Sequence, residues 1–272
     1  MKIIKIVIAA LIGLVILAAI FYAFWLSPRY TVPILTYHYF GYEKQVPIPF
    51  VTPENFEKQM RYLKEKSYRV ISLDTLVEGL KKGRKFPHNT IVITIDDGHQ
   101  SIYTYAYPVL KKYGFCATVF LISDYVGIKE GFLNWDQVKE MSRNNISFGG
   151  HTKNHVYLPS IKNDKDILWN EIAGCKKAIE GRLGIPVDYF CYPSGGLNEE
   201  IEMFVKQAGY KGACATNRGS DIFNRHNFYG LIRVSARNTD PYFSFSNLCK
   251  PLSFRSRLSG YYNIFREQKR GD

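Results

Sequence analysis

Strand-like and helix-like segments alternate along most of the chain, and this alternation restricts the possible folds more than any other feature of the sequence. Runs rich in β-branched and aromatic residues predict strands at 31–40, 68–73, 90–95, 115–122, 146–150, 187–193, 210–216 and 230–236. Capping and breaking residues predict helices between them over 53–66, 74–83, 101–112, 135–143, 164–183 and from 199 onward. Such alternation is typical of parallel strands joined by crossover helices. Roughly seven such units indicate a distorted or incomplete (β/α) barrel. An open doubly wound sheet remains the alternative, because periodicity does not separate the two.

The first segment differs in composition from the rest. Residues 6–26 carry no charged side chain, and Lys2 and Lys5 precede them. A helix of ~20 apolar residues spans a bilayer, whereas the apolar region of a signal peptide has only ~7–15 residues. Aromatic residues typical of the membrane interface close the run, namely Phe21, Tyr22, Phe24 and Trp25. We therefore predict an uncleaved, single-pass membrane anchor within residues 1–30, with a cytoplasmic N-terminus and residues 31–272 outside the cell.

Charge and cysteine content limit what residues 31–272 can do. No domain boundary interrupts them, so we predict one monomeric domain, and the basic, aromatic segment from residue 240 onward gives no structural indication. The net charge is +12, which becomes +10 without Lys2 and Lys5. An exported basic domain suits anionic envelope polymers or lipid headgroups, and no recognition motif points to nucleic acid. The cysteines number five and form no C-x-x-C pair, so zinc-ribbon and redox motifs are absent.

Polar residues that can carry chemistry follow several of the predicted strands. Asp96 and Asp97 directly follow one apolar strand, and His151 follows another. The same is true of His38 and of residues 192–196. Because active groups gather at the carboxyl ends of parallel strands, we expect these residues to share one rim.

Two of these motifs together indicate a metal centre. Asp-Asp-Gly at 96–98 is common in turns, and a pair such as His151 and His155 also occurs on one face of an ordinary surface helical turn. Two imidazoles and one carboxylate, however, form a three-ligand site with room for water, as in catalytic zinc sites. The second carboxylate is then free to accept a proton from the attacking water. A divalent cation also offsets the repulsion between the paired carboxylates.

The motifs resemble those of the polysaccharide deacetylases, also described as the NodB-homology domain or carbohydrate esterase family four. The similarity includes TIDDG, HTKNH and YPSGG in that order, with PILTYHYF, NWDQVKEM and AGYKGACAT, and covers residues 32–235. It is closest in character to the branch acting on poly-N-acetylglucosamine. The resemblance implies a metal-dependent hydrolase that removes N-acetyl groups from N-acetylglucosamine units of a cell-envelope or extracellular polysaccharide.

The resemblance also implies a role for each motif residue. Asp96 would be the general base, and Asp97, His151 and His155 would bind the metal. Zinc is the expected ion, although Co²⁺, Ni²⁺, Fe²⁺ and Mn²⁺ also suit imidazole and carboxylate ligands. The backbone N–H of Ser194 would help to polarise the acetyl carbonyl. It belongs to a substrate and oxyanion loop that comprises Tyr192, Pro193, Ser194 and Gly195.

The sequence departs from the family pattern at three places. Many members have an arginine where Cys191 stands, and we consider Arg233 a spatial replacement, with an ordinary ion pair as the alternative. Many also have a late histidine that acts as the acid, which LIRVS lacks. His38 in TYHYF is then the expected acid, unless it is only a hydrogen-bonded histidine at a strand end. Ser194 replaces a frequent tyrosine.

Some alternatives stay open at this point. Trp135 either lines the sugar site or packs a helix against the barrel. The departures allow a catalytically inactive carbohydrate-binding relative, and the motifs also suit an ester deacetylase acting on O-acetyl groups of a xylan-like glycan.

Overall fold

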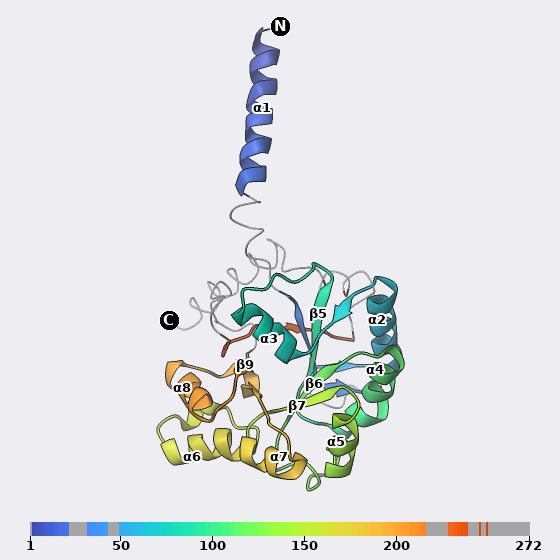
Figure 1. Ribbon diagram of the computed structural model, residues 1–272, viewed down its shortest axis with the longest axis vertical. Helices are drawn as coiled ribbons and strands as arrows, with labels where there is room; N and C mark the ends of the chain where they lie inside the picture. Colours follow the sequence, from blue (N-terminus) through green and yellow to red (C-terminus); the bar gives the residue numbers. More distant parts are fainter. Residues whose placement is uncertain are drawn as a thin grey trace.

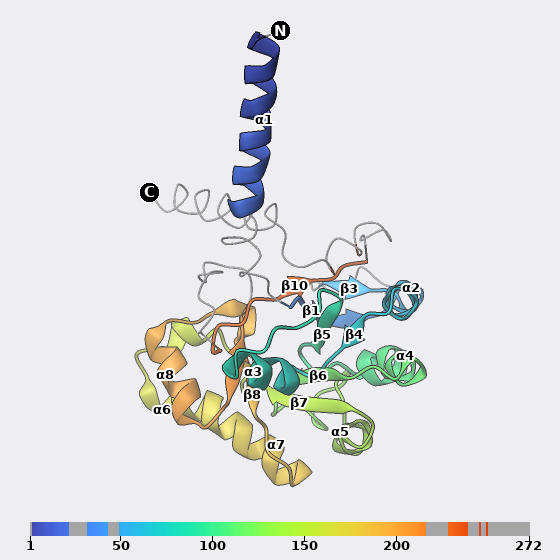
Figure 2. The ribbon, with the colours of Figure 1, turned by 45° about the horizontal axis from the view of Figure 1, so that its top comes forward.

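The computed structural model describes residues 2–21, 32–42, 49–215 and 228–238, together with Phe245 and Cys249. Figure 1 and Figure 2 show a long N-terminal helix and a body in which helices surround the strands. The strands are β1 (Ile34–Tyr37), β2 (Tyr39–Phe40), β3 (Phe50–Val51), β4 (Arg69–Val70), β5 (Thr90–Ile95), β6 (Ala117–Leu121), β7 (Ile146–Gly150), β8 (Tyr189–Cys191), β9 (Gly212–Cys214) and β10 (Val234–Ser235). The helices are α1 (Lys2–Phe21), α2 (Pro53–Glu65), α3 (Leu73–Lys81), α4 (Tyr107–Tyr113), α5 (Trp135–Ser142), α6 (Lys165–Trp169), α7 (Cys175–Leu183) and α8 (Glu199–Gln207).

The main sheet is a nearly closed parallel barrel. Its strand order is β10-β1-β5-β6-β7-β8-β9, with β4 paired to β5 as an eighth strand. Val234 of β10 pairs with Leu35 of β1, and Leu231, three residues earlier, pairs with Cys214 of β9. One short segment thus bridges the two ends of the sheet. The predicted (β/α) barrel is confirmed, and the open doubly wound sheet does not describe this topology.

Alternate residues of β5 face opposite sides of the barrel wall. All six residues of this strand are buried, as expected of a strand covered on both faces. Ile91, Ile93 and Ile95 belong to the hydrophobic cluster that includes α2 and α4. Val92 belongs to a second cluster, inside the barrel, with three residues of α3. The strand therefore delivers successive residues to different environments.

Several predicted elements differ in form from the structure, and two of them show why. The expected strand 68–73 is only β4, because the Ser72 side chain accepts a hydrogen bond from the Thr75 N–H and starts α3. The expected helix 101–112 begins with a π-helical turn, Ile102–Ala106, ahead of α4. The turn ends two residues before Pro108, which has no N–H to continue a regular ladder.

The helix α1 stands apart from the barrel, and none of its side chains is buried. Among the described helices it is the one long and apolar enough to cross a membrane. The predicted interfacial residues Tyr22, Phe24 and Trp25 lie outside the described residues, as does most of the segment from residue 240 onward.

Candidate active site

The loops after β1, β5, β7 and β8 bring the predicted polar residues together at one end of the barrel. Asp96, Asp97 and His151 are buried there, and His38 and His155 are more exposed. The three proposed metal ligands lie close to one another. The proposed base, Asp96, lies close to His38 and Arg233. The common rim expected from the sequence is therefore present.

Three side chains form a candidate metal centre. Asp97 Oδ1 lies 3.4 Å from His151 Nε2 and 3.4 Å from His155 Nε2. These distances are long for hydrogen bonds, but ligands bound tetrahedrally to zinc at ~2.0–2.1 Å would be about 3.4 Å apart. Asp97 Oδ1 is also buried with no hydrogen-bond partner. A carboxylate oxygen that has no hydrogen-bond partner and lies between two imidazole nitrogens can bind a cation, so these residues fit a divalent metal.

The charge state of Asp97 suits a ligand. Burial by itself would raise the pKa of this carboxyl group, but the imidazoles of His151, His155 and His99 outweigh burial and hold its pKa well below the usual value. The carboxylate is therefore ionised at neutral pH, as metal binding requires.

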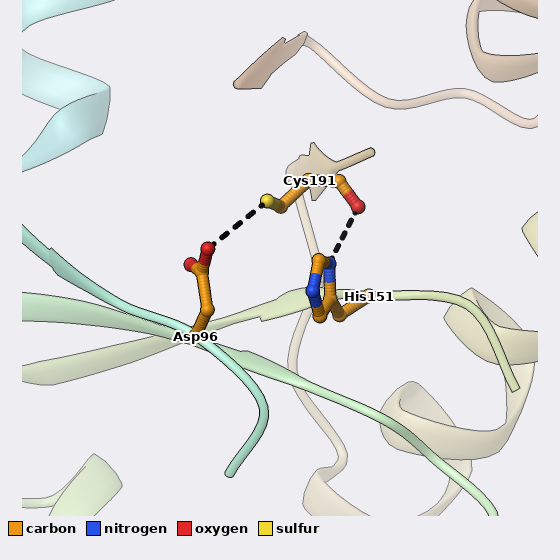
Figure 3. Close-up of side chains that lie close together, drawn as sticks. All are labelled: Asp96, His151 and Cys191. Carbon is orange, nitrogen blue, oxygen red and sulfur yellow. Dashed lines mark hydrogen bonds between the residues drawn. The ribbon is translucent and has the colours of Figure 1, made fainter. Parts of the chain in front are cut away.

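His151 is oriented by a backbone carbonyl. Its Nδ1 lies 2.7 Å from the carbonyl oxygen of Cys191 (Figure 3). A carbonyl only accepts, so Nδ1–H is the donor, and Nε2 is the ring nitrogen that faces Asp97. This arrangement is typical of metal-binding histidines.

A second group of potential ligands is excluded by a neighbouring cation. Asp96, His151 and Cys191 also lie within 4.8 Å of one another (Figure 3). However, Arg233 places Nη1 and Nη2 each 2.7 Å from the Asp96 oxygens and Nη2 3.0 Å from Cys191 Sγ. The guanidinium already neutralises Asp96 and would repel a divalent ion, so we assign the metal centre to the Asp97 group.

Arg233 thus pairs with Asp96 in the way that the sequence departure at Cys191 suggested. Its Nε also donates to the Ala215 carbonyl at 3.2 Å. Burial would raise the pKa of Asp96, but the charge and hydrogen bonds of Arg233 outweigh it and lower that pKa. Asp96 is held ionised and oriented.

His38 lies beside the same carboxylate. Its Nε2 is 3.7 Å from Asp96 Oδ2. Burial lowers the pKa of His38, and the opposing charges of Asp96 and Asp97 do not fully compensate. The imidazole is therefore neutral at neutral pH and would release a proton readily once it had gained one.

The backbone of the site loops is strained. Among the described residues, six non-glycine residues have positive φ, and four of them lie in these loops. They are Asp97 (72°), Thr152 (62°), His155 (58°) and Ser194 (53°). A left-handed conformation costs roughly 1–2 kcal/mol for such residues, and it is typical of functional sites. The two histidines therefore meet through a left-handed loop and not through the helical turn that their spacing suggested.

Two further residues contribute to this site. His99 lies just after the aspartate pair; its Nε2 is 3.7 Å from Asp97 Oδ2, and its ring stacks on Phe132. Glu171, which was not selected from the sequence, contacts the loop between the two histidines.

Trp135 lies next to Gly127 and under Arg182, and helix packing alone accounts for these contacts. Ser194 is exposed between the buried Pro193 and Gly195.

Comparison with known proteins agrees with this geometry. A family model described as polysaccharide deacetylase matches residues 83–213. YxkH of Bacillus subtilis (strain 168), which is named as a polysaccharide deacetylase, is 31% identical over 202 residues, covering 74% of this chain and 70% of YxkH. The poly-beta-1,6-N-acetyl-D-glucosamine N-deacetylase of Staphylococcus aureus (strain MSSA476) is 29% identical over 206 residues, covering 71% of this chain and 70% of the relative. Among solved structures, the Streptococcus pyogenes deacetylase PplD in complex with acetate gives a TM-score of 0.73 at 26% identity, covering 81% of this chain and 98% of PplD.

Proposed function

The chain belongs to the polysaccharide deacetylase family, and on that premise we propose that it removes N-acetyl groups from N-acetylglucosamine units of a cell-envelope or extracellular polysaccharide with the help of a divalent metal. The substrate is inferred from the staphylococcal relative, which is named for it. The observation that carries the metal dependence is the buried Asp97 Oδ1, which has no hydrogen-bond partner and lies between two imidazole nitrogens.

Asp97, His151 and His155 would hold the metal, most simply zinc. When bound, such an ion polarises a carbonyl group and lowers the pKa of water. Asp97 is already ionised, and the Nε2 atom of His151 already faces it, which is the orientation that metal binding needs.

Asp96 would accept a proton from the attacking water. Arg233 binds both of its oxygens, which keeps the carboxylate ionised and fixes its direction. His38, at 3.7 Å from Asp96 Oδ2, would then receive this proton and pass it to the leaving nitrogen. A lowered pKa makes the protonated imidazole a stronger acid, which suits that transfer.

The loop from Tyr192 to Gly195 would receive the acetyl group. Ser194 is the exposed residue of this loop and has a left-handed backbone. We assign its N–H to the acetyl oxygen, where the growing negative charge needs a fixed donor. Its short side chain leaves more room for the sugar than tyrosine would.

Acetate release tests the proposal. The purified full chain, with zinc, is expected to release acetate from an oligomer of β-1,6-linked N-acetylglucosamine. A chelator should stop the release and added zinc should restore it. An O-acetylated xylan assayed in parallel distinguishes an ester deacetylase. Binding of both glycans without any acetate release would instead indicate a non-catalytic relative.

A further inference from the structure

Glu171 is a buried carboxylate that the proposed chemistry does not use. Only 4% of it is exposed, and it lies in a π-helical turn, Asn170–Gly174, between α6 and α7. One oxygen, Oε2, accepts the backbone N–H groups of Lys153 at 2.9 Å and of Asn154 at 3.0 Å. The other, Oε1, accepts Asn154 Nδ2 at 2.7 Å.

These bonds hold the loop that connects the two proposed histidine ligands. The opposite edge of the same loop is held by the segment after β6, where the Ser123 and Asp124 N–H groups donate to the carbonyls of Thr152 and Lys153 at 3.2 and 3.1 Å. The loop backbone is thus clamped from both sides between its left-handed residues, Thr152 and His155.

The two histidines differ in how they are supported. His151 is tied to the sheet, since its N–H donates to the Leu121 carbonyl at 2.8 Å and its Nδ1 is bound to Cys191. The His155 side chain is 39% exposed, and it directly follows the residues that Glu171 holds. Its position therefore depends on the backbone of 152–154.

The helix that carries Glu171 is shaped for close contact with this loop. A Cβ atom at Gly174 would lie 3.1 Å from Lys153 Cδ and 2.7 Å from Asn170 Oδ1. A side chain at this position would require the Lys153 and Asn170 side chains to shift. Single π-helical turns are frequent at functional sites, and this turn carries the clamping carboxylate.

We propose that Glu171 is a positioning residue that fixes the 152–155 loop in advance, so that His155 is ready to bind the metal. This inference rests on the proposed metal-dependent function. It requires the hydrogen-bonding capacity of residue 171 more than its charge. The side-chain oxygen of a glutamine can accept the same two backbone N–H groups. Its NH₂ group can donate to Asn154 if the Asn154 side-chain amide rotates so that its oxygen faces residue 171.

Metal binding by three variants of the full chain tests the inference. We would measure zinc affinity by chelator competition, the visible spectrum of the Co²⁺ form, and the melting temperature of the metal-free protein, for Glu171→Ala, Glu171→Gln and Glu180→Ala. The last is a matched control, because Glu180 also accepts a backbone N–H, that of Val187 at 2.9 Å, but away from the site. We expect Glu171→Ala to bind zinc roughly 10- to 100-fold more weakly, the usual effect of losing an outer partner of a metal site, with an altered Co²⁺ spectrum. Glu171→Gln should recover most of the affinity, and Glu180→Ala should keep all of it.

Each outcome decides the matter. If wild type and Glu171→Ala bind zinc equally tightly, the positioning role is wrong while the proposed function stands. Equal losses in Glu171→Ala and Glu180→Ala would show a general effect of destabilisation and would likewise overturn it. If wild type binds no metal, the proposed function itself fails. Should Glu171→Ala not fold, Asn154→Ala, which removes only the bond to Oε1, should show a smaller loss of the same kind, and an unchanged affinity would contradict the inference.

Discussion

Two adjacent carboxylates serve different partners because the backbone turns between them. Asp96 continues the alternation of β5, so it follows Val92 and Thr94 toward the inside of the barrel, where Arg233 lies. Asp97 has a left-handed φ of 72°, which ends the strand pattern and brings this residue to the histidines. A shared strand end thus supplies the proposed base and the proposed metal ligand at adjacent positions.

The two carboxylates are expected to respond differently to the same substitution. Asp96→Asn should lower kcat by roughly 10²–10⁴-fold, the usual contribution of a general base, but should leave zinc affinity nearly unchanged. Asp97→Asn should weaken zinc binding strongly. Acetate release and chelator competition on both variants check this. A loss of metal from Asp96→Asn equal to that from Asp97→Asn would contradict the assignment of roles.

Removing Arg233 should shift the pH dependence of the reaction. Burial alone raises the pKa of Asp96, and Arg233 is the main group that lowers it. In Arg233→Met the pKa of Asp96 should rise, so the acidic limb of the kcat/KM profile should move to higher pH. The variant should also lose about 3–5 kcal/mol of stability at neutral pH, since a buried charge loses its partner. An acidic limb at the wild-type position would show that Arg233 does not control the base.

Packing between strands decides where the site elements sit. At Gly149 in β7, a Cβ atom would lie 2.5 Å from Phe120 Cδ1 and 2.7 Å from the Tyr189 carbonyl oxygen. The strands on both sides therefore approach this position closely. His151 follows two residues later, so its placement depends on that approach.

Two glycine-to-alanine substitutions should have opposite effects on stability. Gly149→Ala forces the neighbouring strands to move and should lower the free energy of unfolding by ~1–3 kcal/mol, the usual cost of overpacking. Gly181→Ala in α7 meets nothing within 4 Å and should raise it by roughly 0.5–1 kcal/mol, because glycine is a poor helix former. Denaturant unfolding of the metal-free protein measures both. A stabilised Gly149→Ala would show that β7 has more room than the structure indicates.

The chain enters the barrel at the end opposite to the candidate site. All strands of the main sheet are parallel, and the chain enters this sheet at Ile34, the amino end of β1. The site lies at the opposite, carboxyl end of the strands. An anchor formed by α1 would therefore join the barrel at the end away from its substrate.

This arrangement predicts the behaviour of the protein in cells. If α1 is an uncleaved anchor, the intact mass of the purified protein includes residues 1–30, and the protein stays with the membrane fraction at high salt. External protease should digest the barrel on intact protoplasts, because Lys2 and Lys5 favour a cytoplasmic N-terminus. Release of a shorter, soluble chain would show instead that the first segment is a cleaved signal sequence.

The amino-acid sequence was sufficient to predict the barrel and to select Asp97, His151 and His155 as the proposed metal ligands. Strand and helix signals are local, since they depend on residue spacing and capping within a few turns, and parallel strands then place their carboxyl ends on one rim. Asp96, Asp97 and His151 could be found in this way because each lies at the end of a predicted strand. His155 was found from its spacing to His151, and the separate roles of the two aspartates came from the family resemblance.

The partners that come from distant parts of the chain depend on how the folded barrel packs. Arg233 reaches Asp96 because it directly precedes β10, which pairs with β1 where the two ends of the sheet meet. Glu171 reaches the histidine loop because a π-helical turn brings it there. Neither contact has a periodic or spacing signal, since each joins residues from separate elements whose distance depends on how the barrel packs. The left-handed conformation of the loop that joins the histidines could not be predicted from the sequence either. Contacts with other elements offset its strain, and those contacts depend on the fold.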